Sequence, residues 1–316
     1  MKRDPVAAAL QTLAVAASRP HDAATLALVR GSLAHRSNHV VGRAARAARE
    51  TELTALAPDL VTAFLRFLED PVRRDPGCVA KAEIVQTLLA FGHPAPDVYL
   101  RGAAHIQREP AFGPPVDTAA QLRAISAMAL VVTEHPAALT TCVGLLVDPE
   151  PAARAGGIRS LTASGRLDVA LLLRLFVLRG DDDPGVLAEA FAGLLALSPD
   201  DSMAFVVERL ATADRDVARA AAIALGEARR TEAVQALRER LPSEARPDVR
   251  HAIILALATS RDDGAVHALL DMIARGSAAD SKVAVEALGL YAHDEGLQRR
   301  VHAALEARRP ARRRQR

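Results

Sequence analysis

The sequence contains no tryptophan, and aromatic residues make up 3% of the chain. Its two cysteines, Cys78 and Cys142, are too few and too far apart to form a disulfide framework. Cysteine usage of this kind is typical of a reducing compartment, so we expect a cytoplasmic protein. No stretch reaches the roughly 18 uninterrupted apolar residues that a membrane span requires, and we therefore expect no membrane partner.

Lysine is also scarce, because only Lys2, Lys81 and Lys282 are lysines among 40 basic residues. This arginine and alanine bias is typical of a GC-rich bacterial genome, so abundant arginine alone does not indicate nucleic-acid binding. Helix-forming residues dominate, and the runs of β-branched residues that a sheet needs are missing. The composition predicts an all-α fold.

The N-terminal stretch MKRDPVAAALQTLAVAAS has a basic start and an apolar run, as a short export signal does. However, Asp4-Pro5 is a helix start signal, with Asp as N-cap and Pro at the first helical position. Gln11 and Thr12 also interrupt the apolar run. We therefore expect an amphipathic helix of the mature protein here.

A ladder of leucines runs through the chain at a steady period. Its members are Leu88, Leu130, Leu161, Leu194, Leu225, Leu257 and Leu288. From Leu161 onward the intervals are 33, 31, 32 and 31 residues. Each leucine follows a stretch of small residues, and an Asp precedes it in each segment. A period of this length is typical of stacked helical repeats, in which each unit buries its apolar face against its neighbours.

The segments after residue 136 separate into pairs of helices. The expected helices are 137–147 with 152–163, 167–178 with 184–197, 201–211 with 214–228, 231–241 with 247–258, and 263–274 with 280–292. In the turns, Asp is expected to accept hydrogen bonds from free N–H groups at the start of the second helix. A last helix, 295–307, is rich in charge and reads as the cap of the array.

These residues resemble the HEAT repeat, most of all the short bacterial variety also found in phycobilin-lyase subunits. The best match is Asp214, Val217, Ala221 and Ala224-Leu225-Gly226. The resemblance implies a right-handed α-α superhelix of about eight helix pairs over residues 1–307. Within it, 1–59 would be a divergent N-terminal capping repeat and 294–307 the C-terminal capping helix. HEAT arrays serve many functions, so the resemblance specifies the fold far better than the activity.

One position, seven residues before each ladder leucine, is often basic. It holds Lys81, Arg123, Arg154 and Arg250 in four of the seven segments. The resemblance implies that a basic residue here pairs with the turn Asp of an adjacent repeat. A basic stripe that contacts phosphates is the alternative, although non-basic residues interrupt the row in the middle.

The interval from Leu88 to Leu130 is 42 residues, about ten longer than the repeat. The excess lies in 99–118, an irregular insertion, and insertions in repeat arrays often carry binding. We expect a loop closed by its own polar contacts, and the alternative is a partner or ligand site. His105 and Glu109 are spaced so that they could share one helical face. The candidate partner-binding residues are Lys81, Glu83, Arg101, His105, Gln107, Arg108 and Glu109.

The C-terminal segment 308–316 is basic, with arginines at Arg308, Arg309, Arg312, Arg313, Arg314 and Arg316. We expect a disordered tail, and the open alternatives are a solubilising end and a contact with phosphates or an acidic surface.

Recognisable catalytic and cofactor motifs are missing from the sequence. No His is followed by Glu, the dipeptide of metal-binding HEAT hydroxylases, and no Cys/His cluster has zinc spacing. Gly156-Gly157 lacks the strand and the lysine of a phosphate loop. Alkylpurine glycosylases with HEAT-like repeats use tryptophans, which this chain does not have. The sequence therefore predicts a non-enzymatic protein with no catalytic residues, metal or cofactor.

Three functions remain open. We expect a scaffold or adaptor that binds another protein across the repeat surface. The first alternative is a nucleic-acid-binding protein that uses the arginines and the basic tail. The second is a lyase-like or chaperone-like subunit that acts on a cofactor-bearing protein.

Overall fold

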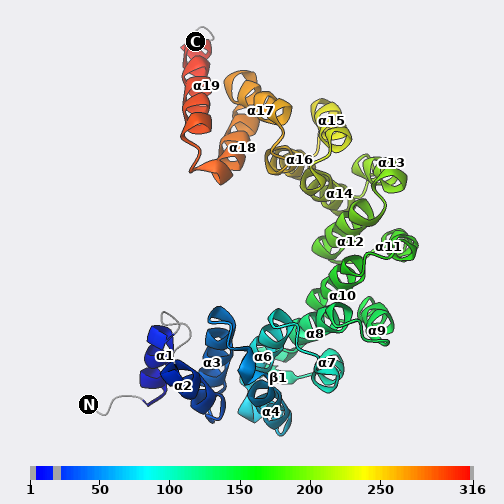
Figure 1. Cartoon of the computed structure of the whole chain (residues 1–316). Helices are drawn as coiled ribbons and strands as arrows, with labels where there is room; N and C mark the ends of the chain where they lie inside the picture. The colour runs from blue at the N-terminus through cyan, green and yellow to red at the C-terminus, as the bar shows by residue number, and fades with distance from the viewer. Residues whose placement is uncertain (1–4, 17–22, 314–316) are drawn as a thin grey trace. The chain divides into compact units, whose positions relative to one another are not determined.

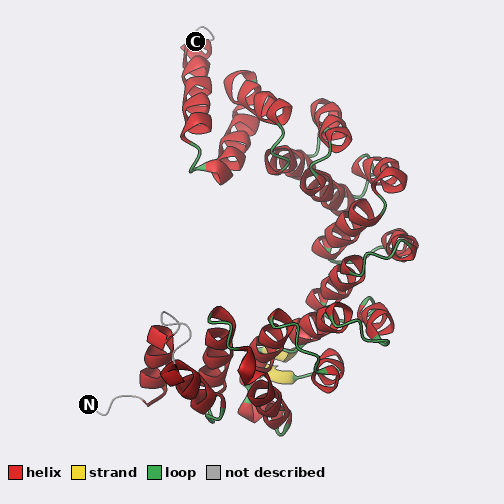
Figure 2. Cartoon of the chain, in the orientation of Figure 1, coloured by secondary structure: helices red, strands yellow, loops and turns green. Residues whose placement is uncertain are grey.

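The computed structural model describes residues 5–16 and 23–313, and α-helices dominate it (Figures 1 and 2). The chain forms two compact units, residues 1–165 (unit 1) and 166–316 (unit 2). The all-α prediction is confirmed. The predicted N-cap Asp4 lies outside the described residues, and α1 begins at Pro5. The prediction of one continuous domain over 1–307 stays a prediction.

Unit 1 contains ten α-helices and one two-stranded antiparallel sheet among the described residues. Its elements are α1 Pro5–Ala16, α2 Ala23–Leu33, α3 Asn38–Glu50, α4 Ala57–Leu68, α5 Pro71–Arg74, α6 Val79–Ala90, α7 Pro96–Ala103, β1 Arg108–Ala111, β2 Gly113–Asp117, α8 Ala120–Val132, α9 Ala138–Leu145 and α10 Pro151–Ala163. Helices α3, α6, α8 and α10 pack one on the next, and α2, α4, α7 and α9 pair with them in turn.

Unit 2 repeats this arrangement with helices alone in its described part. Its elements are α11 Asp168–Arg179, α12 Pro184–Leu197, α13 Pro199–Leu210, α14 Arg215–Ala228, α15 Thr231–Arg240, α16 Pro247–Thr259, α17 Asp263–Arg275, α18 Ala278–Leu288 and α19 Glu295–Arg313. Helices α12, α14, α16 and α18 form one row, and α11, α13, α15 and α17 pair with them. The expected helices after residue 136 therefore exist and pair as predicted.

The ladder leucines form the core of both rows. All seven have at most 1% of their surface exposed. Each lies near the end of the second helix of a helix pair. The small residues before the leucine let the second helix of the neighbouring pair approach closely. The leucine period thus marks the helices that stack along each unit.

The turn aspartates act as predicted in several repeats. Asp183 and Asp214 accept hydrogen bonds from backbone N–H groups in the first turns of α12 and α14. At α18 the cap is different, because Ser277 accepts the bond from the N–H of Asp280. The carboxylate of Asp280 instead pairs with Arg250 of the preceding repeat at 2.7 Å.

The basic residues seven positions before the ladder leucines make different contacts. Arg123 reaches Asp148 of the following turn at 2.8 Å, just as Arg250 reaches Asp280, so the implied pairing with an adjacent repeat is confirmed at these two positions. Arg123 also pairs with Asp117 of its own turn at 2.8 Å, as Lys81 pairs with Asp75 of its own turn at 3.0 Å. Arg154 donates to the backbone oxygens of Asp148 and Pro149 in its own turn.

Candidate functional site

The predicted insertion folds as a β-hairpin that leads from α7 into α8 (Figure 2). Arg108 pairs with Asp117 and Glu109 with Val116, and a bulge follows before the tip at Phe112. Gly113 has φ 134°, a backbone conformation that side chains disfavour, so a glycine suits this sharp reversal. His105 and Glu109 do not share a helical face, although their spacing would allow it, because His105 precedes the hairpin and Glu109 lies in β1.

A buried polar network fixes the start of β1 to α6. The Oε1 atom of Gln107 accepts a hydrogen bond from Nζ of Lys81 at 2.9 Å. Its Nε2 donates to the backbone oxygen of Asp75 at 2.8 Å and to Oε1 of Glu109 at 2.6 Å. Lys81, Asp75 and Gln107 are all buried. Because buried polar groups that are fully paired specify one arrangement, this network holds the hairpin in place.

The carboxylate of Glu109 is the second fixed point of β1. It accepts hydrogen bonds from the N–H of Gly77 and from Oγ1 of Thr118, each at 2.7 Å. Burial acts to raise the pKa of Glu109, but the bonds from Thr118, Gln107 and Gly77 outweigh it and hold the pKa below its usual value. The side chain is therefore ionised at neutral pH and is engaged within the protein.

The end of β2 is fixed by Asp117. Its Oδ1 accepts from the N–H groups of Gln107 and Ala119, and its Oδ2 lies 2.8 Å from Nη1 of Arg123. Burial acts to raise the pKa of Asp117, but these bonds outweigh it and lower the pKa. Arg123 also donates to Asp148, so one guanidinium joins the hairpin to two successive turns.

His105 lies beside the same network. Its Nε2 is 3.2 Å from Oε1 of Gln107. Burial lowers the pKa of His105, and the nearby charges of Lys81 and Arg123 add to that effect. The ring is therefore neutral at pH 7, and it is a packing and hydrogen-bonding group of the hairpin base.

Three apolar side chains of the hairpin segment face solvent. Ile106, Phe112 and Val116 are exposed, and Phe112 at the tip is fully so. Pro110 lies in β1, and Pro114 and Pro115 lie in β2. Proline lacks a backbone N–H, so the open strand edges offer few donors to another strand. Recognition here would therefore depend on side chains rather than on strand addition.

A groove of about 400 Å³ adjoins the base of the hairpin. Glu83 of α6 lies in its wall and pairs with Arg46 and with Arg49, both of α3. Thr118, which bonds Glu109, also lines this groove. Cys78 lines it too, but burial raises the pKa of its thiol to about 12, so the thiol stays protonated. The groove is a charged surface rather than a nucleophilic site.

The predicted site residues therefore separate into two groups. Lys81 and Gln107 are buried and Glu109 is tied within the protein, so these three position the hairpin instead of offering a binding surface. Arg101 and Arg108 are exposed on α7 and β1, and Glu83 lies in the groove. The sequence prediction missed Ile106, Phe112 and Val116. These three residues could have been noticed as apolar residues within a segment rich in proline and glycine.

The basic C-terminal segment begins as helix, which corrects the predicted disordered start at residue 308. Helix α19 continues to Arg313, and Nη1 of Arg308 donates to the backbone oxygens of Ile273 and Gly276 at 3.1 and 2.8 Å. These bonds satisfy carbonyls at the end of α17. Arg314 and Arg316 lie outside the described residues, and the role proposed for the tail stays a prediction.

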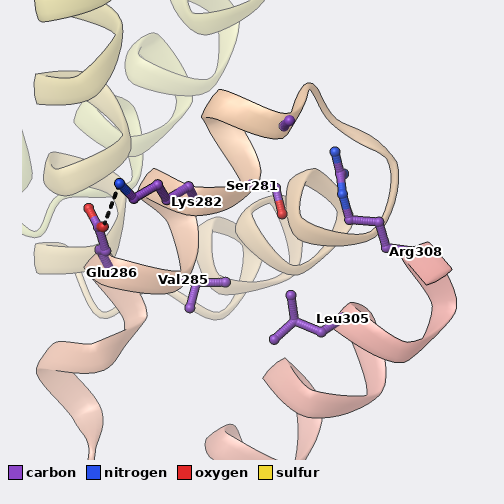
Figure 3. A pocket seen from close by; sticks show the side chains of 7 residues that line it. Ser281, Lys282, Val285, Glu286, Leu305 and Arg308 are labelled. Carbon is purple, nitrogen blue, oxygen red and sulfur yellow. Dashed lines mark ion pairs between the residues drawn. The ribbon is translucent and has the colours of Figure 1, made fainter. Parts of the chain in front are cut away.

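A second cavity, of about 450 Å³, lies between α18 and α19 (Figure 3). Its apolar lining includes Val285 and Leu305. Its charged groups are already engaged: Lys282 pairs with Glu286 at 3.8 Å, and Arg308 bonds the carbonyls described above. This cavity therefore offers a weaker recognition surface than the hairpin.

Among residues 5–16 and 23–313, no three His, Cys, Asp or Glu side chains are grouped so as to hold a metal ion. Within the same ranges, no helix combines the length and the apolar character needed to cross a membrane.

The chain is similar to known repeat proteins in one segment. Residues 203–289 match the family model for HEAT repeats. A solved structure of human deoxyhypusine hydroxylase in complex with glycerol is also similar, at 15% identity and a TM-score of 0.31, with 92% of each chain covered. No curated protein sequence matches the chain.

The prediction of a non-enzymatic protein is corrected by this comparison. The matched human protein is an enzyme by its name. A repeat fold by itself does not settle whether a protein is an enzyme. The likeness itself is too distant to transfer an activity.

Proposed function

Because the chain carries HEAT repeats at residues 203–289, we propose that it is an interaction protein that binds another protein through its hairpin. The observation that carries this proposal is Phe112, a fully exposed aromatic side chain at the tip of a hairpin. Aromatic side chains of this kind are common anchors of protein interfaces, because they bury a large apolar area at a small entropic cost.

The anchored base of the hairpin supports the proposal. Gln107 and Glu109 hold β1, and Asp117 holds β2 through Arg123. A hairpin that is fixed before binding loses little conformational entropy on binding, which favours affinity. The proposed contact surface is Ile106, Phe112 and Val116, with Arg108 at its edge and the groove of Glu83 beside it.

The nucleic-acid alternative has less support from the described arginines. Arg46, Arg49 and Arg123 pair with carboxylates, and Arg308 bonds backbone carbonyls. Retention of DNA or RNA that falls steeply with salt would favour the alternative over the hairpin proposal.

We also propose that the protein is cytoplasmic, since Cys78 and Cys142 are buried free thiols.

The test is affinity capture from the source organism with the intact protein and a Phe112→Ser variant. We expect the intact protein to retain a defined protein and the variant to lose it, with unchanged circular dichroism for both. Leu290→Ser is the matched control, because Leu290 is also an exposed apolar residue but lies in unit 2. Equal capture by the Phe112→Ser variant would contradict the proposal.

A further inference from the structure

Helix α11 presents a row of exposed leucines in unit 2. Leu167, immediately before the helix, is 70% exposed, and Leu171, Leu175 and Leu178 are 74%, 64% and 59% exposed. Their spacing of four, four and three residues places them on one face of the helix. The opposite face, with Leu173 and Phe176, is buried against unit 2. The helix is therefore apolar on both faces, and one of them meets solvent.

The other first helices of unit 2 are different. Helices α13, α15 and α17, all within the described residues, carry none of the large apolar side chains that are exposed in this unit. The exposed leucine row is thus specific to α11 and does not follow from the repeat pattern. Contiguous exposed apolar surface of this kind marks an interaction site in a folded protein.

The position of α11 in unit 2 is fixed by Arg174. Its Nη2 donates to the backbone oxygen of Asp201 at 2.9 Å, and its guanidinium lies 4.5 Å from the ring centre of Phe205 on α13. The leucine row therefore lies on a helix that is held at both its buried face and its side. A partner would meet a preformed surface.

We propose that this row binds the same row of a second copy of the chain, with the two α11 helices antiparallel. The first argument is the spacing. Around a twofold axis near residue 173, Leu167 faces Leu178 of the second copy, and Leu171 faces Leu175 of the second copy. The midpoint of Leu167 and Leu178 and the midpoint of Leu171 and Leu175 lie within about one residue of each other, or roughly 1.5 Å along the helix, so one twofold axis serves both pairs. An antiparallel copy of the row therefore places each leucine opposite a leucine.

The second argument is charge. Asp168 begins α11 and Arg179 ends it, and both side chains are exposed. In the antiparallel arrangement Asp168 of each copy faces Arg179 of the other. A parallel arrangement would instead bring like charges together at both ends. Antiparallel helices also place opposite dipole ends side by side.

The charges just outside the helix follow the same rule. Arg166 precedes Leu167, and Asp182 follows the helix end, both exposed. About the same axis, Arg166 of one copy approaches Asp182 of the other. Arg166 already bonds Asp168 within its own chain at 2.7 Å, so each end of the dimer would carry an alternating set of charges. Charge complementarity of this kind sets the orientation of an interface more than its affinity.

The test is sedimentation velocity of the full chain over a range of concentrations up to about 100 µM. We expect a concentration-dependent dimer, and we expect the Leu171→Glu/Leu175→Glu variant to weaken association at least about 100-fold because it places like charges in the apolar row. Leu290→Glu, an exposed apolar position elsewhere in unit 2, is the control and should leave the dimer unchanged. An intact chain that stays monomeric, or a leucine variant that dimerises as well as the intact chain, would overturn the inference.

Orientation is tested by reversing the charges. Asp168→Arg and Arg179→Asp should each weaken the dimer, and the double variant should restore it, because both cross-pairs then form again with reversed signs. A double variant that is no better than the single variants would overturn the antiparallel arrangement. Neither test involves Phe112, so the hairpin proposal and this inference can fail independently.

Discussion

Nζ of Lys81 lies 3.0 Å from Oδ2 of Asp75, and both side chains are fully buried in unit 1. The same carboxylate accepts the N–H groups of Ala80 and Lys81, and Asn38 donates to it from α3. Lys81 also holds Gln107, so this pair joins α3, α6 and the hairpin. The turn that contains Asp75 therefore anchors the inserted hairpin through Lys81 and Gln107.

Lys81→Met should destabilise unit 1 by about 3–5 kcal/mol, because it leaves a buried carboxylate without its cation. The measurement is denaturant unfolding followed by circular dichroism, together with hydrogen exchange at the hairpin amides, which should become faster. Lys282→Met is the control: Lys282 is 78% exposed and should contribute less than about 1 kcal/mol. A loss below about 1 kcal/mol for Lys81→Met would show that the pair does not anchor the hairpin.

Leu225→Ala should cost roughly 2–5 kcal/mol of the free energy of unfolding of unit 2, since this ladder leucine is fully buried in α14. Ile223→Ala on the same helix removes a partly exposed side chain and should cost much less. Thermal and denaturant unfolding measure both variants. Similar costs for the two would mean that the ladder leucines are not the core of the row.

Gly226→Ala should also destabilise unit 2, by about 1–3 kcal/mol or more. A Cβ at Gly226 would lie 2.6 Å from the backbone oxygen and 2.7 Å from Cα of Ala256, so α14 and α16 would have to move apart. Gly289→Ala is the control, because its Cβ would meet no atom within 4 Å and its φ of −62° suits alanine. Calorimetric melting temperatures should fall for the first variant and stay or rise slightly for the second.

Glu244 should make unit 2 sensitive to acid. Hydrogen bonds from Arg246, with further contributions from Arg240, outweigh burial and lower the pKa of Glu244 to about 2. Because the folded pKa is below the unfolded value, the carboxylate stabilises the fold above about pH 4.5. That contribution is lost as the pH falls from about 4.5 towards 2.

Glu244→Gln should therefore remove this part of the pH dependence and lower the free energy of unfolding at neutral pH by roughly 1–3 kcal/mol. Urea unfolding between pH 2 and 7 measures the effect. Glu232→Gln is the control, since Glu232 is exposed and pairs with Arg230 at 3.6 Å. An unchanged pH profile in the Glu244→Gln variant would contradict the assignment.

The helix pairs could be predicted because their signals are local. The leucine period, the small residues before it and the turn aspartates all act within one repeat, and the resulting helices agree with the expected ranges to within a few residues. The implied partners of Arg123 and Arg250 were also predictable, because the repeat brings each position beside the next turn. Lys81 departs from this rule where the insertion supplies Gln107 as a further partner.

The hairpin was less predictable. The long interval between Leu88 and Leu130 identifies the right segment, but its pattern does not specify a β-hairpin over a helix. Which side chains of that segment are buried depends on Asp75, Gly77 and Lys81, whose hydrogen-bonding partners Gln107 and Glu109 lie 26 to 32 residues further along the chain. Gln107 and Glu109 therefore became anchors, while Phe112 became the exposed residue.

By itself, the sequence determined the all-α class, the repeat period and the residues of the core, because helix propensity and apolar periodicity act over short distances. The tertiary structure alone decided which polar residues are buried and which apolar residues are exposed. Burial depends on the surfaces that neighbouring helices cover, and α11 shows this: its leucines look alike in sequence, yet Leu173 is core and Leu171 faces solvent.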